Sequence, residues 1–173
     1  MRQTLFSVLS RRGVRGKLRG YRGISTDRGR FVKLAPLSDE NKTQIQEAMN
    51  KRYVAGNKAL DLSNFGADQA FGGSSGAIGK LSDERVMDVV IDTIGQHFAD
   101  PEALSLTNNN LRTLRVLGKI VEKARNIKIL HLDNNKLSHS KELDNISKLN
   151  IVELKLDGNP FIANFKEGAD YSR

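Results

Sequence analysis

The chain has 173 residues, with 28 Lys and Arg against 20 Asp and Glu, and its net charge is +8. It contains no cysteine, which excludes a disulfide scaffold and thiolate metal sites. No apolar run approaches the roughly 18 residues that a transmembrane helix requires. The charge is uneven: residues 1–36 hold ten basic residues and one acid, whereas residues 37–173 hold 18 basic and 19 acidic residues. This asymmetry predicts a basic arm joined to a near-neutral body, and it indicates that the arm binds a polyanionic partner.

Residues 11–30, "RRGVRGKLRGYRGISTDRGR", alternate basic side chains with five glycines. Glycine at this density disfavours a helix, so residues 1–36 are predicted to form a basic, mostly disordered arm. Such a strand can follow a phosphate backbone, while Arg and Tyr stack on bases. The predicted RNA-binding residues are Arg11, Arg12, Arg15, Lys17, Arg19, Tyr21, Arg22, Arg28 and Arg30.

Two other interpretations of the arm stay open. It can be a solvated tail that only keeps the protein soluble. It can also be a mitochondrial targeting segment, because the first 26 residues are acid-free, contain Arg and Ser, and carry Leu5, Phe6, Val8 and Leu9 near the start.

Residues 38–53, "SDENKTQIQEAMNKRY", predict a helix with Ser38 as its N-cap and with Ile45, Met49 and Tyr53 on one face. The first repeat of a solenoid needs a cover for its apolar end. This capping helix and the body behind it form the second expected domain, residues 37–173.

The body repeats one pattern. "LSLTNNNL" at 104–111, "LHLDNNKL" at 130–137 and "LKLDGNPF" at 154–161 each place an Asn three residues after a Leu-x-Leu, and "LDLSNF" at 60–65 is a weaker copy with Phe65 in the Asn position. This is the leucine-rich repeat signature. It predicts an α/β solenoid of short parallel strands with helices on the outer side. Asn109, Asn135 and Asn159 are predicted to be structural, because an inward amide satisfies backbone groups where the chain leaves the strand.

Helices are expected between the strands. After a flexible insertion at 71–80, Ser82 is the expected N-cap of a helix that buries Val86, Val90 and Ile94. The next helical stripes are Leu114, Leu117, Val121 and Ala124, and then Leu143, Ile146 and Leu149.

The outward positions of the strands form an expected protein-binding platform, because they mix charges rather than concentrate positive ones. They are Ser105, Thr107, His131, Asp133, Lys155 and Asp157. No catalytic constellation, metal-ligand spacing or cofactor motif is found: "GGSSGAIGKL" has Ser74 and Leu81 where a phosphate-binding loop needs Gly and a hydroxyl residue. The chain is therefore expected to be non-enzymatic, with no cofactor and no metal.

"KRY" at 51–53 ahead of "ALDLSNF", and "KELDNI" and "LKLDGNPF" in the last repeat, resemble the nuclear RNA export factor family of TAP-like mRNA exporters. The resemblance covers about residues 40–166. It implies an mRNA export receptor that is located in the nucleus and is able to shuttle to the cytoplasm. The cargo side of such a receptor contacts mRNA and protein adaptors of export. The family's RRM-like domain is absent or reduced to a strand near 31–35, and its C-terminal domains are missing, so the chain is expected to be a fragment or a shortened form. The family's NTF2-like partner is not expected to bind, because the domain that pairs with it is absent.

The sequence thus predicts the RNA-binding part of an mRNA nuclear export receptor, without enzymatic activity and without a membrane partner. The alternative is a leucine-rich repeat protein-interaction module whose N-terminus is a mitochondrial targeting segment. Cleavage near residue 25 in cells would favour the alternative, and nuclear retention of an intact arm would favour export.

Overall fold

A computed structural model describes residues 24–25, 31–32, 35–72, 78–98 and 100–163 of the chain. The chain divides into two compact units, Met1–Pro36 and Leu37–Arg173. In the first unit, β1 (Ile24–Ser25) pairs antiparallel with β2 (Phe31–Val32). β2 lies at the start of the strand expected near 31–35, whereas its pairing with β1 was not among the expectations for the arm. Of the predicted flexible insertion at 71–80, residues 73–77 lie outside the described residues, and Phe71 ends the 3-10 helix that begins at Gln69.

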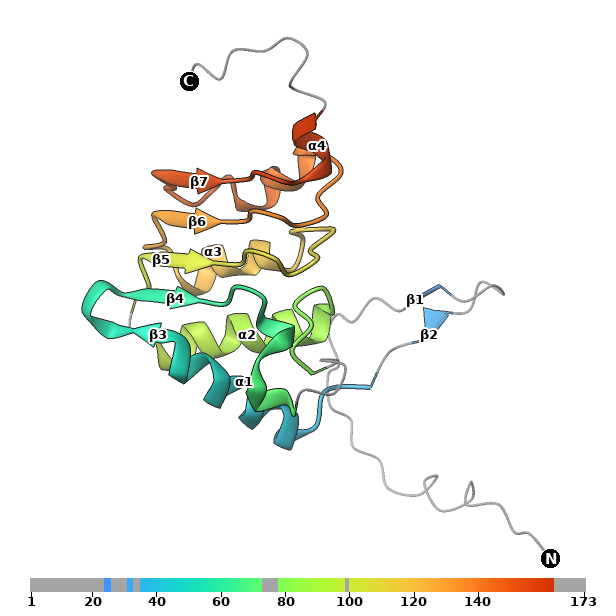
Figure 1. The fold of residues 1–173 in the computed structure, drawn as a ribbon, viewed down its shortest axis with the longest axis vertical. Helices are drawn as coiled ribbons and strands as arrows, with labels where there is room; N and C mark the ends of the chain where they lie inside the picture. The colour runs from blue at the N-terminus through green and yellow to red at the C-terminus, as the bar shows by residue number, and fades with distance from the viewer. Residues whose placement is uncertain (1–23, 26–30, 33–34, 73–77, 99, 164–173) are drawn as a thin grey trace, which may run out of the picture. The chain divides into compact units, whose positions relative to one another are not determined.

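The second unit is a stack of repeats built on one sheet. The sheet order is β3-β4-β5-β6-β7, with β3 antiparallel to β4 and all later pairs parallel. Figure 1 shows β4 to β7 lying one above the other, with α1 beside the first strand and α4 beside the last. The strands are β3 (Tyr53–Val54), β4 (Ala59–Asp61), β5 (Ala103–Ser105), β6 (Ile129–His131) and β7 (Glu153–Lys155). The predicted α/β leucine-rich repeat solenoid is confirmed.

Helices form the second layer. The α-helices are α1 (Asp39–Arg52), α2 (Glu84–His97), α3 (Ile120–Lys123) and α4 (Pro160–Ala163). The 3-10 helices are η1 (Ala55–Asn57), η2 (Phe65–Ala67), η3 (Gln69–Phe71), η4 (Leu117–Lys119) and η5 (Ser140–Ile146). None of these helices, within the described part of the chain, has the length and apolarity needed to cross a bilayer.

The core lies between the two layers and is continuous from α1 to the last repeat. Strand leucines fill it from one side, and α2 fills it from the other with Val86, Val90 and Ile94. On the solvent side of the helical layer, three acids of α2 that are spaced one helical turn apart form ion pairs with bases of the next repeat. The pairs are Glu84 with Arg115, Asp88 with Lys119, and Asp92 with Lys123. These ion pairs align α2 with the helical segment of the next repeat.

The Asn of each repeat ties that repeat to the preceding one. The side-chain oxygen of Asn135 accepts the backbone N–H groups of Asn109 (3.1 Å) and Leu111 (3.0 Å), and its Nδ2 donates to the carbonyl of Leu106 (3.0 Å). Asn109 accepts from the Phe65 N–H in the same manner, at 2.9 Å. These bonds cross between repeats, so the predicted structural role of the Asn row is confirmed.

The residue just before the Asn slot has a left-handed backbone in every repeat. The φ angles are 47° at Asn64, 59° at Asn108, 52° at Asn134 and 72° at Gly158. Asn and Gly are the residues that adopt this conformation at least cost. The turn chemistry, and not only the leucine spacing, therefore selects this strand exit.

Several local predictions were wrong. Tyr53 is not on the first helix, because α1 ends at Arg52 and Tyr53 starts β3, where its ring lies 4.8 Å from that of Phe98. The N-cap of α2 is Asp83, whose carboxylate accepts from the Arg85 N–H, and not Ser82.

The helical stripes also needed correction. In the second repeat, which begins with β5, the buried residue is Ile120 and not Val121, which is only partly buried, because α3 begins at Ile120 after a 3-10 turn. Leu143 and Ile146 belong to a 3-10 helix, whose three-residue turn matches their spacing better than an α-helix does.

Candidate functional site

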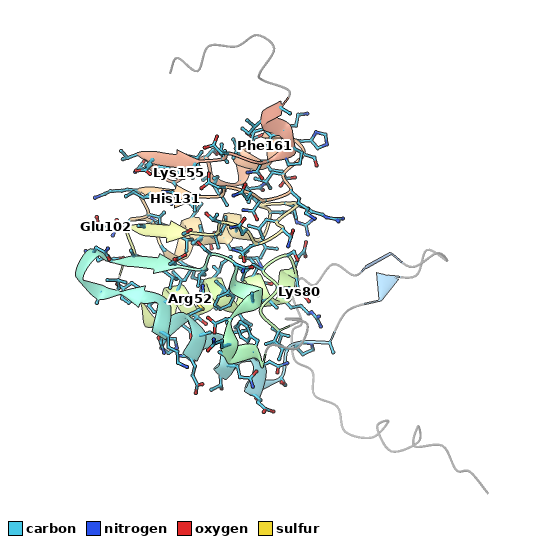
Figure 2. The ribbon with its side chains drawn as sticks, viewed as in Figure 1. Arg52, Lys80, Glu102, His131, Lys155 and Phe161 are labelled. Atoms are coloured by element: carbon cyan, nitrogen blue, oxygen red, sulfur yellow. The ribbon has the colours of Figure 1, made fainter. Side chains whose placement is uncertain are left out.

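One face of the sheet turns away from the core and carries polar side chains. Leu60, Leu104 and Leu130 are at most 2% exposed, and the residues that follow them on the strands point the opposite way. The parallel register aligns these next residues in one row: Asp61, Ser105, His131 and Lys155. Figure 2 shows His131 and Lys155 at successive levels of the sheet.

A second row follows two residues further along each repeat: Ser63, Thr107, Asp133 and Asp157. We call the two rows together the sheet platform. The six predicted protein-binding residues, Ser105, Thr107, His131, Asp133, Lys155 and Asp157, all lie on it, so the structure brings them together on one surface.

Hydrogen bonds connect the platform side chains across the repeats. The hydroxyl oxygens of Ser63 and Ser105 lie 2.7 Å apart, and Ser105 Oγ donates to Thr107 Oγ1 at 3.3 Å. Thr107 in turn makes a long contact of 3.5 Å to Asp133, whose other carboxylate oxygen accepts the Asp157 N–H at 3.1 Å. The platform is therefore an ordered polar surface in which side chains hold one another in position.

At the far strand, Glu153 makes contacts with both basic residues of the platform. Its carboxylate oxygen lies 3.0 Å from His131 Nε2 and 3.4 Å from Lys155 Nζ. The hydrogen bond from His131, followed by that from Lys155, holds the pKa of Glu153 below its usual value. Glu153 therefore stays ionised and partly neutralises the charge of Lys155 beside it.

Another carboxylate, Glu102, lies at the end where the strands begin. It accepts hydrogen bonds from Lys58 (3.1 Å) and Lys128 (3.3 Å), and these two bonds lower its pKa. Figure 2 shows Glu102 at this border of the sheet. Three successive repeats thus share one exposed ion-pair cluster, which closes this side of the platform.

Arg52 anchors the first repeat beneath the platform. Its guanidinium donates to the Ser63 carbonyl (2.8 Å) and to Asp68 (2.6 Å), and it lies 5.5 Å from the centre of the Phe65 ring. It also donates to the carbonyl of Asp61, at 3.3 Å. Arg52 therefore fixes the backbone from which the first platform residues project.

Acids outnumber bases on the platform. Asp61, Asp133 and Asp157 face one lysine, Lys155, and a single imidazole, that of His131. Partial burial would raise the pKa of Asp61, but hydrogen bonds from the Ser63 hydroxyl and N–H outweigh it and lower that pKa. A surface of this charge disfavours a phosphate backbone and suits a protein segment that carries basic and hydrogen-bonding side chains.

The described residues offer little for small-molecule or metal chemistry. They contain no group of three His, Cys, Asp or Glu side chains able to hold a metal ion. A hollow between α2 and the second repeat, lined by residues such as Met87, Arg112 and Leu117, has a volume of about 60 Å³. Ligand pockets are usually about 300–1,000 Å³, so this hollow is too small for a typical metabolite.

Some residues of this surface were missed by the sequence reasoning. Asp61 and Ser63 occupy the same repeat positions as Ser105 and Thr107, so alignment of the weak first copy could have found them. Glu153 shares its strand face with Lys155 and follows from strand alternation. Arg52 had no signal, because its contacts depend on how α1 meets η3. The nine predicted RNA-binding residues of the arm lie outside the described residues.

The chain was compared with known protein families and curated proteins. The model of the NXF1/2/3/5 leucine-rich repeat domain family matches residues 50–173. Nuclear RNA export factor 2 of Homo sapiens is 35% identical over 143 residues, which cover 79% of this chain and 23% of that protein. Nuclear RNA export factor 1 of Caenorhabditis elegans is 34% identical over 135 residues, covering 78% of this chain and 21% of that protein. The chain thus spans about a fifth of the length of these relatives.

Among solved structures, the Mex67 LRR domain from Chaetomium thermophilum matches with a TM-score of 0.54 and 21% sequence identity. The match covers 70% of this chain and 78% of that one. The structure of Chaetomium Mex67:Mtr2 subunits gives a TM-score of 0.56 at the same identity, over 70% of this chain and 76% of the matched one. At this identity the two structures support the fold.

Proposed function

The chain belongs to the nuclear RNA export factor family, and from this premise we propose that it serves as the cargo-side part of an mRNA export receptor. The observation that carries the proposal is the family match over residues 50–173, which includes every strand of the repeat stack. In this proposal the arm binds RNA and the sheet platform binds a protein adaptor of export. The chain acts in the nucleus and shuttles to the cytoplasm with its cargo.

The distribution of charge supports RNA binding by the arm and protein binding by the platform. Residues 1–36 have one acid among ten basic residues, whereas the remainder has one more acid than bases. Phosphate neutralisation supplies most of the affinity of non-specific RNA binding, so the arm is the part suited to it. The platform, with its three aspartates, is suited to a protein with basic side chains.

The arm residues proposed to contact RNA are Arg11, Arg12, Arg15, Lys17, Arg19, Tyr21, Arg22, Arg28 and Arg30. A chain of this composition engages only part of its charges at one time, about four to six. Each phosphate neutralised on single-stranded RNA contributes about −0.7 to the slope of log affinity against log salt. The expected slope is therefore about −3 to −4.

A salt titration of RNA binding tests the proposal, with the intact chain and two variants of equal charge. In the first variant Arg11, Arg12, Arg15, Lys17, Arg19 and Arg22 become Ala, and most of the slope should be lost. The control variant removes six exposed charges of the second unit, which form no ion pair within the described residues, and it should keep the slope. Its changes are Lys51→Ala, Lys80→Ala, Arg125→Ala, Lys136→Ala, Lys141→Ala and Lys148→Ala.

A third variant, Lys155→Ala, separates RNA from protein at the platform. If the platform binds a protein, this change leaves RNA affinity as it is. A lower RNA affinity would place RNA on the platform. Equal slopes for the arm variant and its control would contradict RNA binding by the arm.

A further inference from the structure

The strand β7 ends the sheet within the described residues, so one of its edges has no partner strand there. On its inner side the Glu153 N–H donates to the Lys128 carbonyl (3.0 Å), and the Lys155 carbonyl accepts from the Leu132 N–H (2.8 Å). Backbone groups alternate in direction along a strand, so the N–H and C=O of Leu154 between them point outward. Within the described residues no strand pairs with this outer edge. An unpaired edge of this kind is a template for another strand.

The same edge exposes apolar side chains. Leu154 is 38% exposed and Val152 is 84% exposed, whereas the equivalent Leu104 and Leu130 are 2% and 1% exposed. Leu154 occupies a core position of the repeat, but within the described residues a neighbouring repeat lies on one side of it only. The edge therefore combines free backbone groups with apolar surface, and each of the two favours coverage by a further strand.

The charges of β7 select what that strand is. The segment reads Val152-Glu153-Leu154-Lys155-Leu156, an acid and a base placed symmetrically about one leucine. In an antiparallel pair centred on Leu154, the two Leu154 residues face each other and exchange both backbone hydrogen bonds. Glu153 of each copy then faces Lys155 of the other copy, and Val152 faces Leu156. Opposite charges directly across an antiparallel pair are stabilising.

From this self-complementarity we propose that β7 is a homodimerisation strand, which pairs antiparallel with β7 of a second copy of the chain about a two-fold axis at Leu154. The interaction is isologous, so the same patch serves both copies. It joins the two sheets into one and puts the two platforms on a common face. Glu153 and Lys155 are 47% and 50% exposed, so both side chains can exchange their exposed 3.4 Å contact for the equivalent contacts with the other copy.

The interface is small, since it consists of one short strand from each copy and its flanking apolar residues. Interfaces below about 1,200 Å² give weak and transient association. The dimer is therefore expected to form reversibly with rising protein concentration. When an adaptor or cargo offers two sites, the paired platforms bind with higher avidity than one platform does. The proposal rests on the fold alone and does not depend on RNA binding by the arm.

Sedimentation equilibrium of the intact chain over a wide concentration range is the test. The wild-type mass should rise from that of a 19.2 kDa monomer towards twice that value. Glu153→Lys gives each copy two cations on this strand, which then face the same two cations of the other copy, and Lys155→Glu does the same with two acids. Each single variant should weaken self-association at least tenfold. An equimolar mixture of the two should associate again, because the cations of one variant then face the acids of the other.

Matched controls and a second readout make the result decisive. Glu122→Lys and Lys141→Glu make the same charge changes at exposed positions away from β7, and both should leave the dissociation constant unchanged. Amide exchange at Leu154 should slow as the wild-type concentration rises and should not do so in either single variant at β7. Circular dichroism checks that every variant is folded. A monomeric wild type at all concentrations would overturn the proposal, and so would a dimer that either single variant leaves intact or a mixture that fails to associate.

Discussion

The first and last strands of the repeat stack are built from the same Leu-x-Leu pattern, yet their leucines have different surroundings. Leu60 in β4 is 1% exposed and Leu154 in β7 is 38% exposed. The outer edge of β4 pairs with β3, and Ile45 and Met49 of α1 are fully buried in the adjacent core. Within the described residues, the outer edge of β7 has no comparable cover. In a solenoid each repeat contacts only its neighbours, so burial of a repeat leucine depends on what lies next to it.

The strongest test of the difference between an inner and an end repeat is to replace the equivalent leucine of each by alanine. Leu130→Ala should reduce the free energy of unfolding by about 3 kcal/mol, because it removes a fully buried side chain and leaves a cavity. Leu154→Ala should cost less than about 1 kcal/mol, because part of that side chain is already in water. Urea denaturation measures both.

These measurements belong at the lowest protein concentration that gives a signal, so that self-association does not bury Leu154. The m-value should stay constant, which shows that the folded and unfolded states remain comparable. Equal losses for the two variants would mean that the β7 edge is covered in the monomer, and the contrast between the ends would then be wrong.

The sequence pattern was sufficient for the periodic features and insufficient for those that depend on a neighbour. The period of the leucines and the fixed distance to Asn109, Asn135 and Asn159 gave the solenoid, the parallel sheet and the outward face. The same pattern gives Leu154 the repeat position equivalent to Leu104 and Leu130. Pattern alone could not show that this side chain is 38% exposed, because that exposure depends on the repeat beside it.

Helix starts and short helices were harder to predict for a similar reason. Ser82 and Asp83 are both good N-cap residues, and only the turn made by Lys80 and Asp83 decides between them. The 3-10 geometry at residues 117–119 shifts the buried position from Val121 to Ile120. Arg52 was unpredictable, since its hydrogen bonds join α1 to the end of β4, to the loop after it and to the N-cap of η3. For the platform, the repeat positions correctly placed six residues on the outward face. They missed Asp61 and Ser63, because the first copy of the repeat was too weak to be used.

The Asn row provides a second test of the inner and end repeats, with a smaller expected effect. Asn135 accepts two backbone N–H groups and donates to the carbonyls of Leu106, Leu132 and Asp133. Asn159 accepts one and donates to two. Since buried groups left unpaired are costly, Asn135→Ala should lower stability by about 2 kcal/mol and Asn159→Ala by about 1 kcal/mol. Thermal and urea unfolding give the two values.

Asn135→Asp offers a control for shape, because it keeps the accepting oxygen and removes the donating amide. The stability of Asn135→Asp should lie between that of wild type and that of Asn135→Ala only if the hydrogen bonds accepted from Asn109 and Leu111 contribute more than the bonds donated by the amide. RNA affinity of every folded variant should equal that of the wild type. No change in unfolding midpoint for Asn135→Ala would contradict the structural role.

The last test concerns the end of the stack that α1 covers, and its effect, which depends on pH, is expected in the ion pair between Arg52 and Asp68. Their 2.6 Å contact joins the end of α1 to η3, and the two side chains are 25% and 17% exposed. Partial burial alone would raise the pKa of Asp68. The Ala70 N–H and the Arg52 guanidinium outweigh it, so that the pKa lies below its usual value. A lowered pKa in the folded state means that the carboxylate stabilises the fold above the ordinary aspartate pKa and ceases to do so as pH falls through the folded value.

Asp68→Asn tests this pair without removing the cap, because the amide oxygen can still accept the Ala70 N–H. The variant should be less stable than wild type by about 1 kcal/mol at neutral pH. This difference should shrink towards zero in acid, as Asp68 of the wild type becomes protonated. Asp144→Asn changes an exposed aspartate that forms no ion pair within the described residues, and it should stay within about 0.5 kcal/mol of wild type. Urea unfolding at a series of pH values measures the difference. A gap between wild type and Asp68→Asn that stays constant into acid would show that the Asp68 charge does not contribute to closing this end of the stack.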